Sequence, residues 1–132
     1  MVELFNRLTG KSRRHNRALR YLKEWVASVD SFLVAYHLHE DAGIGFFLQN
    51  ARKATFDLIT ISHQGRELIR PVSKIKDSQV LPLFLQAIDD IESLRRALLS
   101  PSLRREKLPE ITRRLRQSFG GLRERLTVVE YL

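Results

Sequence analysis

The sequence predicts an all-α protein, an antiparallel up-down-up-down four-helix bundle with a short N-terminal extension. Apolar residues recur at steps of three and four in four segments of similar length, which is the period of amphipathic helices. The connections between these segments are short, so consecutive helices must lie antiparallel to each other. The expected helices span about residues 13–38, 44–70, 78–99 and 107–130 of a single domain, residues 1–132.

The first two helices are defined by their apolar faces and by the turn between them. Leu22 and Trp25 lie on one face of the first segment, and Leu58 and Ile61 lie on one face of the second. Residues 39–45 combine acidic residues with glycines, which is typical of one helix ending and another beginning. We therefore place the first turn of the bundle there.

Prolines mark the remaining helix boundaries. We expect the second helix to end before Pro71 and the third before Pro101, because the residue that precedes a proline disfavours helical geometry. Pro109 suits the first turn of the fourth helix, where the missing N–H breaks no hydrogen bond, and Pro82 must either lie in the first turn of the third helix or kink it. The sequence LTVVEYL at 126–132 is β-prone, so the alternative there is a strand.

Length and composition limit the class of protein. A chain of 132 residues with 43% hydrophobic residues is long enough to form one domain with its own core. The chain has no cysteine, so neither a disulfide framework nor a thiolate metal site is expected. It has no apolar run of about 18 residues that would predict a membrane span, and no secretory signal pattern. We therefore expect a cytoplasmic protein.

Charge is segregated along the chain. Residues 1–23 contain seven Lys/Arg and one acid, and residues 95–125 contain ten Lys/Arg and three acids. Residues 24–94 contain six basic and ten acidic residues. The formal net charge of +8 therefore comes from the two basic segments. This pattern is typical of a protein that meets an anionic partner or an acidic neighbouring surface.

Arginines dominate both basic segments, and we expect them to meet in the folded protein. The first and last helices of an up-down bundle are neighbours, so their basic arcs should merge into one surface, joined by Lys107 and its neighbours in the last loop. Arginine keeps its charge and offers a planar fork that matches phosphate and carboxylate. The alternative is an ordinary solvated helix face. The expected anion-binding residues are Arg13, Arg14, Arg17, Arg20, Arg104, Arg105, Arg113, Arg114, Arg116 and Arg123.

These features favour a non-enzymatic binding or assembly module. A surface of arginines would bind a nucleic acid backbone largely without reading its base sequence. The alternative is an adaptor that docks on an acidic protein surface. A lesser alternative is peripheral membrane contact, because an apolar start at residues 1–8 precedes a basic cluster within residues 1–17.

The outer face of the first helix predicts self-association. Ala27, Ser31 and Ala35 are spaced by four, and small residues in such a row allow another helix to approach closely. The middle of this helix carries a single charge, Asp30, whereas a solvated face is usually more polar. We expect a homo-oligomer, with a dimer favoured over a neutral surface that touches nothing.

Catalytic and metal sites are not predicted. The densest group of potential metal ligands comprises His37, His39, Glu40 and Asp41. Metal sites in bundles draw ligands from several helices, so we interpret this group as a polar helix end. His63 is expected to be semi-buried, and Asp30 and Asp57 lie at similar heights, where they either meet or bind separate partners. We expect no catalytic residue, metal or cofactor.

Overall fold

The computed structural model describes the backbone of residues 2–40 and 43–130, and the side chains of residues 13–40, 43–100 and 107–129. The protein is all-α and 86% helical. Within the described residues there are six helices and no strand, which confirms the predicted fold class at this level. The helices are α1 (Val2–Ala35), α2 (Ile44–Gln49), α3 (Ala51–Glu67), α4 (Ile69–Val72), α5 (Val80–Leu99) and α6 (Pro101–Glu130).

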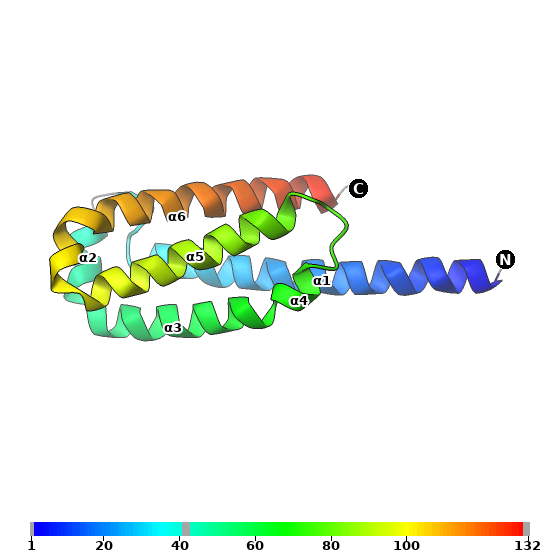
Figure 1. The fold of residues 1–132 in the computed structure, drawn as a ribbon, viewed down its shortest axis with the longest axis horizontal. Coiled ribbons are helices and arrows are strands. Elements are labelled where there is room, and N and C mark those ends of the chain that lie inside the picture. Colours follow the sequence, from blue (N-terminus) through cyan, green and yellow to red (C-terminus); the bar gives the residue numbers. More distant parts are fainter. Residues whose placement is uncertain (1, 41–42, 131–132) are drawn as a thin grey trace.

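The four longest helices, α1, α3, α5 and α6, run along a common axis, and each is antiparallel to the next one in the chain (Figure 1). We call the end that holds α2 and the α5–α6 junction the His39 end. We call the end that holds α4 and the loop at residues 73–79 the Asp77 end. At the Asp77 end, the N-terminal part of α1 projects beyond every other helix (Figure 1).

The core is organised around Trp25, whose side chain contacts both α3 and α5. Its Nε1 donates a hydrogen bond to the carbonyl oxygen of Ile61 in α3, at 2.9 Å. Its ring meets the ring of Phe84 in α5 edge-on, with the centroids 5.0 Å apart. A Cβ atom at Gly65 would lie 3.0 Å from Nε1, so glycine allows the indole to lie against α3. The largest fully buried side chains are Leu22, Val29, Leu38, Phe47, Leu58, Phe84, Ile91, Leu94, Leu98, Leu108, Leu115 and Leu122.

The second predicted helix, at 44–70, is divided into three. At Asn50 the backbone leaves helical geometry, with φ −111° and ψ 26°, and its side-chain Nδ2 donates to the carbonyl oxygen of Phe46. This break separates α2 from α3. Pro71 has no N–H to donate to the carbonyl oxygen of Glu67, and a proline ring clashes with that carbonyl in a continuous helix. Accordingly, α3 ends at Glu67 and α4 forms a separate turn.

The first predicted helix, at 13–38, differs from α1 at both of its ends. α1 is helical from Val2, so the expected N-terminal extension is part of the helix. It ends before His37, whose φ of 54° lies in the left-handed region that non-glycine residues rarely adopt. Gly43 then passes so close to His37 that a Cβ atom would lie 1.5 Å from the carbonyl oxygen of His37. This turn therefore requires glycine at that position.

The fourth helix begins earlier than the predicted residue 107. Ser100 has extended geometry, with φ −111° and ψ 110°, and Pro101 is the first residue of α6. A single residue therefore connects α5 to α6, and the last loop expected from the sequence is helical. Pro109 consequently lies inside α6, in its third turn, and not in the first turn as predicted.

Three further expectations concern α5, the C-terminus and membrane spans. Pro82 lies in the first turn of α5, which is the first of the two predicted alternatives. The part of 126–132 that the structure describes is helical, so the strand alternative is wrong for it. Residues 131–132 lie outside the described residues. None of the described helices is long and apolar enough to span a membrane.

The contact between Trp25 and Gly65 yields a stability prediction. In Gly65→Ala the new methyl group would press on an indole that its hydrogen bond to Ile61 and its contact with Phe84 hold in place. Overpacking costs about 1–3 kcal/mol, and the better helix propensity of alanine offsets about 1 kcal/mol of that. We expect the free energy of unfolding, measured by urea denaturation, to fall by about 1 kcal/mol.

Gly120→Ala is the matched control, because a methyl group at this helical glycine would have no neighbouring atom within 4 Å. We expect it to raise the free energy of unfolding by about 0.5–1 kcal/mol, through helix propensity alone. If the free energy of unfolding changed by the same amount and in the same direction in the two variants, the contact with Trp25 would not be what disfavours a side chain at position 65.

Candidate anion-binding surface

Two contacts show that the C-terminal part of α1 and the turn after it lie beside residues 116–123 of α6. Arg116 of α6 donates a hydrogen bond to the carbonyl oxygen of His39, at 2.5 Å, just after α1 ends. Arg123 pairs with Asp30 in the middle of α1, with Nη1 and Oδ1 3.3 Å apart. The residue numbers rise along α6 as they fall along α1, so these helices are antiparallel.

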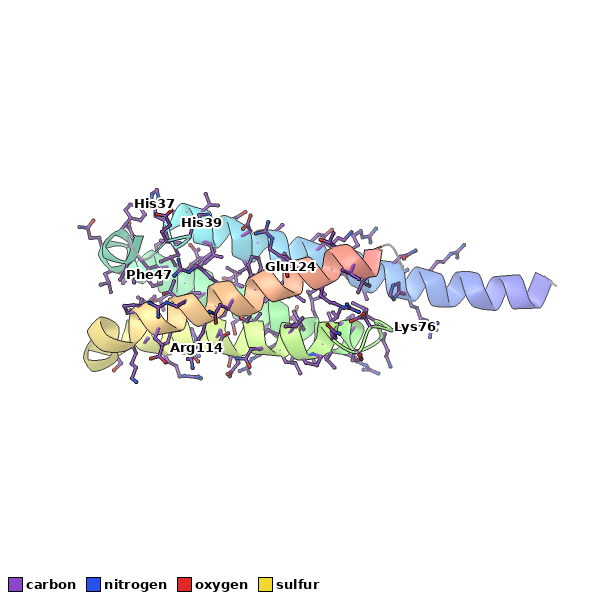
Figure 2. The ribbon with its side chains drawn as sticks, turned by 90° about the horizontal axis from the view of Figure 1, so that it is seen from above. His37, His39, Phe47, Lys76, Arg114 and Glu124 are labelled. Atoms are coloured by element: carbon purple, nitrogen blue, oxygen red, sulfur yellow. The ribbon has the colours of Figure 1, made fainter. Side chains whose placement is uncertain are left out.

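This antiparallel arrangement places the arginines of α1 and two arginines of α6, Arg113 and Arg114, toward opposite ends of the molecule. Arg20 precedes Asp30 by ten residues, which is about 15 Å along a helix axis. Arg113 precedes Arg123 by ten residues, which is about 15 Å in the opposite direction. Figure 2 shows Arg114 toward the His39 end. About 30 Å therefore separates Arg20 from Arg113, so the α1 arginines and those near the start of α6 do not merge into the single surface expected from the sequence.

Several arginines of α6 already have partners within the chain. Besides its pair with Asp30, Arg123 lies over the ring of Phe119, 5.7 Å from its centroid. Arg116 contacts the backbone of His39. The other predicted residues on α6 are Arg104, Arg105, Arg113 and Arg114. The first two have side chains outside the described set, and the last two are exposed at the His39 end.

The arginines of α1 are in a different situation. Arg13, Arg14, Arg17 and Arg20, which we call the α1 arginine cluster, are all exposed. Among the described side chains, none of them has a carboxylate partner, and Arg20 only lies over the ring of Tyr21, at 5.4 Å. Positions 13, 17 and 20 fall on one face of the helix. The structure thus keeps the predicted α1 residues together and leaves their charge uncompensated.

Sequence reasoning missed two cations at the same end. Lys74 and Lys76 lie in the loop at 73–79, and both are exposed. Figure 2 shows Lys76 at the Asp77 end, where α1 begins to project. The loop that joins the second and third helices of an up-down bundle lies at the same end as the chain's N-terminus. The predicted order of the helices therefore already indicated that these lysines lie at the same end as the N-terminus.

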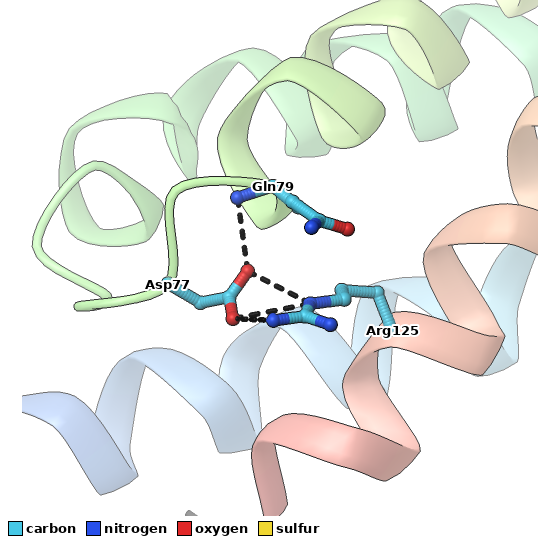
Figure 3. Close-up of polar contacts among 3 residues, drawn as sticks. All are labelled: Asp77, Gln79 and Arg125. Carbon is cyan, nitrogen blue, oxygen red and sulfur yellow. Dashed lines mark hydrogen bonds and ion pairs between the residues drawn. The ribbon is translucent and has the colours of Figure 1, made fainter.

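The only acid of that loop is neutralised by α6 and so does not offset the lysines. Arg125 donates from Nε and Nη2 to the carboxylate of Asp77, whose side chain is 6% exposed (Figure 3). The backbone N–H of Gln79 donates to Oδ1 at 2.9 Å, which fixes the carboxylate before α5 begins. The hydrogen bonds from Arg125 hold the pKa of Asp77 below its usual value, against the opposing effect of burial.

Three further polar contacts hold α3 against its neighbours. Glu92 of α5 is buried and accepts hydrogen bonds from Ser62 and Arg66 of α3. Burial alone would raise the pKa of Glu92, but these hydrogen bonds outweigh it and hold the pKa below its usual value. The hydroxyl of Tyr36 donates to Asp57 at 2.6 Å, and burial together with this bond raises the pKa of the phenol.

No known protein family, curated protein or solved structure matches this chain.

The carboxylates and the histidine singled out in the sequence have separate surroundings. Asp30 faces Arg123 of α6, whereas Asp57 accepts from Tyr36, so the two acids bind separate partners. His63 is exposed, with its Nε2 3.0 Å from Glu67, so the expectation of a semi-buried histidine is wrong. These residues therefore do not converge on one site.

The histidines at the His39 end line a shallow hollow of about 430 Å³. The ring of His37 meets that of Phe46 edge-on, with centroids 4.8 Å apart. Among the described residues no group of three metal-ligating side chains is close enough to hold an ion. Asp41, the fourth member of the group noted in the sequence, lies outside the described residues.

The small residues predicted to mediate self-association lie on the surface. Ala27, Ser31 and Ala35 are all exposed on α1. Val34, beside them, is 53% exposed. The face is thus available for contact with another chain.

The ion pair between Asp77 and Arg125 predicts a pH dependence of stability. Because the pKa of Asp77 is lowered in the folded state, the pair stabilises the fold above the usual carboxyl pKa, about 4, and this contribution is lost as pH falls through the lower folded value. Asp77→Asn should therefore lower the thermal midpoint at pH 7. The difference from the wild type, followed by circular dichroism, should shrink toward zero below about pH 3.

The matched control for this prediction is Asp89→Asn, at an exposed aspartate of α5. This substitution removes the same charge without breaking the contact with Arg125, so the midpoint should stay close to that of the wild type. A constant difference between wild type and Asp77→Asn from about pH 7 to about pH 3 would contradict the role given to the ion pair.

Proposed function

We propose that this protein is a non-enzymatic binding module whose α1 arginine cluster, together with Lys74 and Lys76, binds the phosphate backbone of a nucleic acid. One observation carries this proposal. The four arginines are exposed, have no carboxylate partner among the described side chains, and lie toward the part of α1 that projects beyond the other helices (Figure 1). Uncompensated cations gathered at one end create a positive potential that attracts a polyanion.

We infer that the four long helices form the antiparallel up-down-up-down four-helix bundle expected from the sequence. The alternating directions of these helices in Figure 1, and the contacts of α1 with both α3 and α6, support this topology. In this arrangement the bundle anchors the C-terminal half of α1, where Trp25 is buried. Ala18 and Leu19 are buried as well, so the bundle contacts α1 within the α1 arginine cluster, and the part of α1 before the cluster projects beyond the other helices.

The spacing of the arginines suits several phosphates at once. Arg13, Arg17 and Arg20 span seven residues, which is about 10 Å along the helix axis. One strand of a nucleic acid carries about three phosphates over that length. A single helix also fits the major groove of duplex DNA, which is about 12 Å wide. Guanidinium groups bind phosphate oxygens through paired N–H donors, so this contact is independent of base sequence.

An acidic protein surface and an anionic membrane offer the same charge to this cluster. The membrane alternative would additionally use the apolar residues near the N-terminus, whose side chains lie outside the described set. Nucleic acid is preferred because arginine predominates among the exposed cations of α1, and its planar fork matches phosphate. The test below therefore uses duplex DNA.

We also propose that the α1 face with Ala27, Ser31 and Ala35 forms a homodimer contact. The exposed Val34 supports this proposal, because it adds apolar area beside the small residues. The face is distinct from the α1 arginine cluster, which lies further toward the N-terminus. Self-association would therefore leave the cluster free to bind.

The polyanion proposal predicts a strong effect of charge reversal on α1. In Arg13→Glu/Arg17→Glu, affinity for a labelled duplex DNA at low salt should fall more than tenfold. The slope of log affinity against log salt should decrease by about 2, since each phosphate that a cation neutralises releases about one counterion. Fluorescence anisotropy over a series of salt concentrations measures both quantities.

The matched control is Arg113→Glu/Arg114→Glu, which makes the same charge change at the His39 end. Its salt slope should stay close to that of the wild type. Equal losses in the two double variants would assign binding to net charge and contradict the proposed surface. Affinity for DNA that persists at several hundred millimolar salt would also contradict a phosphate contact.

The dimer proposal is tested by sedimentation equilibrium. Ser31→Arg places a charged side chain in the middle of the small-residue face, so it should convert a dimeric wild type to monomers. Gln117→Arg, at a position of α6 outside this face, adds the same charge elsewhere and should leave the dimer intact. A wild type that stays monomeric at high concentration would contradict the contact.

A further inference from the structure

The outer face of α3 carries an exposed aromatic ring among cations. Phe56 is 71% exposed, which is the highest exposed fraction among the large hydrophobic side chains that the structure describes. Arg52 lies one turn before it and Lys53 three residues before it, and both are exposed. With Gln49 and Asn50 these residues line a hollow of about 520 Å³ at the His39 end.

This exposure follows from the way α3 packs. The core face of the helix consists of Ala54, Leu58, Ile61 and Gly65, so Phe56 points away from it. The hollow itself lies where Asn50 interrupts the helix between α2 and α3. Burying a phenylalanine ring stabilises a protein by about 1.5–3 kcal/mol relative to leaving the ring exposed. Because Phe56 is mostly exposed, most of this stabilisation is absent in the isolated chain.

Arg52 and Lys53 are uncompensated. Neither has a carboxylate partner among the side chains that the structure describes. The hollow that they share with Phe56 is otherwise lined by amides, which are neutral. A ligand that fills it must therefore be anionic and must also offer a flat apolar surface to the ring.

The immediate neighbours of the ring argue against a docking site for an apolar protein surface. On a helix, residue 56 is flanked by positions 52, 53, 59 and 60. Three of these are polar, and only Ile59, 48% exposed, adds apolar area. An aromatic ring isolated in a cationic surface is instead the arrangement that binds single-stranded nucleic acid, where bases stack on rings and cations contact phosphates.

We propose that Phe56 stacks on an unpaired base of a single-stranded nucleic acid, while Arg52 and Lys53 contact the adjacent phosphates. This inference rests on the proposed function and names its ligand class. The contact between Tyr36 and Asp57 places Phe56 at the level of residue 36 in α1. The α1 arginine cluster lies 16–23 residues earlier, about 24–35 Å away along the axis. A strand of about ten nucleotides spans that distance.

The test compares two labelled single strands by fluorescence anisotropy, an oligothymidine of about twelve nucleotides and an abasic strand of the same length. The wild type should bind oligothymidine more tightly. Phe56→Ala and Phe56→Leu should each lose about tenfold in affinity for oligothymidine, because stacking on an aromatic ring contributes strongly to the binding of each base. Binding of the abasic strand should be the same in all three proteins.

Phe56→Trp should restore the affinity for oligothymidine, because indole also stacks on bases. Its fluorescence should be quenched on binding, whereas the buried Trp25 of the wild type should respond little. Ile59→Ala is the matched control at the adjacent exposed apolar side chain, and it should bind like the wild type. Each substitution is at an exposed position, and circular dichroism checks that the helices are intact.

Several results would overturn the inference. If Phe56→Leu bound oligothymidine as tightly as the wild type, an apolar contact at residue 56 would be sufficient and the ring would not stack on a base. Equal wild-type affinities for the two strands would show that no base is bound. In either case, binding that still depends on Arg13 and Arg17 would leave the proposed function standing. Failure to bind either strand or the duplex at low salt would overturn both proposals.

Discussion

The placement of the long helices depends on one side chain, the indole of Trp25. It lies against Gly65, donates to the carbonyl of Ile61 and meets the edge of Phe84, so a single residue of α1 sets the distance to both α3 and α5. Large aromatic side chains fix such geometry because they bury much area and tolerate few orientations. The axial level of every exposed cation on α1 relative to α3 follows from this contact.

Ion pairing inside the molecule decides which of the cations remain available. Three carboxylates, those of Asp30, Asp77 and Glu92, bind arginines of α3 and α6. The cations left without such partners among the described side chains include those of the α1 arginine cluster, Lys74 and Lys76, and two residues at the start of α3. Net charge alone therefore gives little guidance to function, because paired and unpaired arginines contribute equally to it.

The sequence predicted the apolar faces of the helices correctly, and it predicted the residues at which the helices begin and end less well. The apolar positions that defined the predicted faces of the first two helices are buried, as for Leu22 and Leu58. Helix limits were missed because they depend on single backbone events, such as the break at Asn50 and the effect of Pro71 on the preceding carbonyl. The separation of the two arginine groups follows from antiparallel order and a rise of about 1.5 Å per residue, so sequence reasoning could have found it. The exposure of Phe56 required the packed structure.

The junction at Ser100 has a consequence for how the chain folds. α5 and α6 are joined by this one residue and pack along most of their length (Figure 1), so the contacts nearest Ser100 close short loops of chain and lose little entropy. Contacts of this local kind form early in folding. We expect α5 and α6 to begin to pair next to Ser100 and to extend their contact away from it.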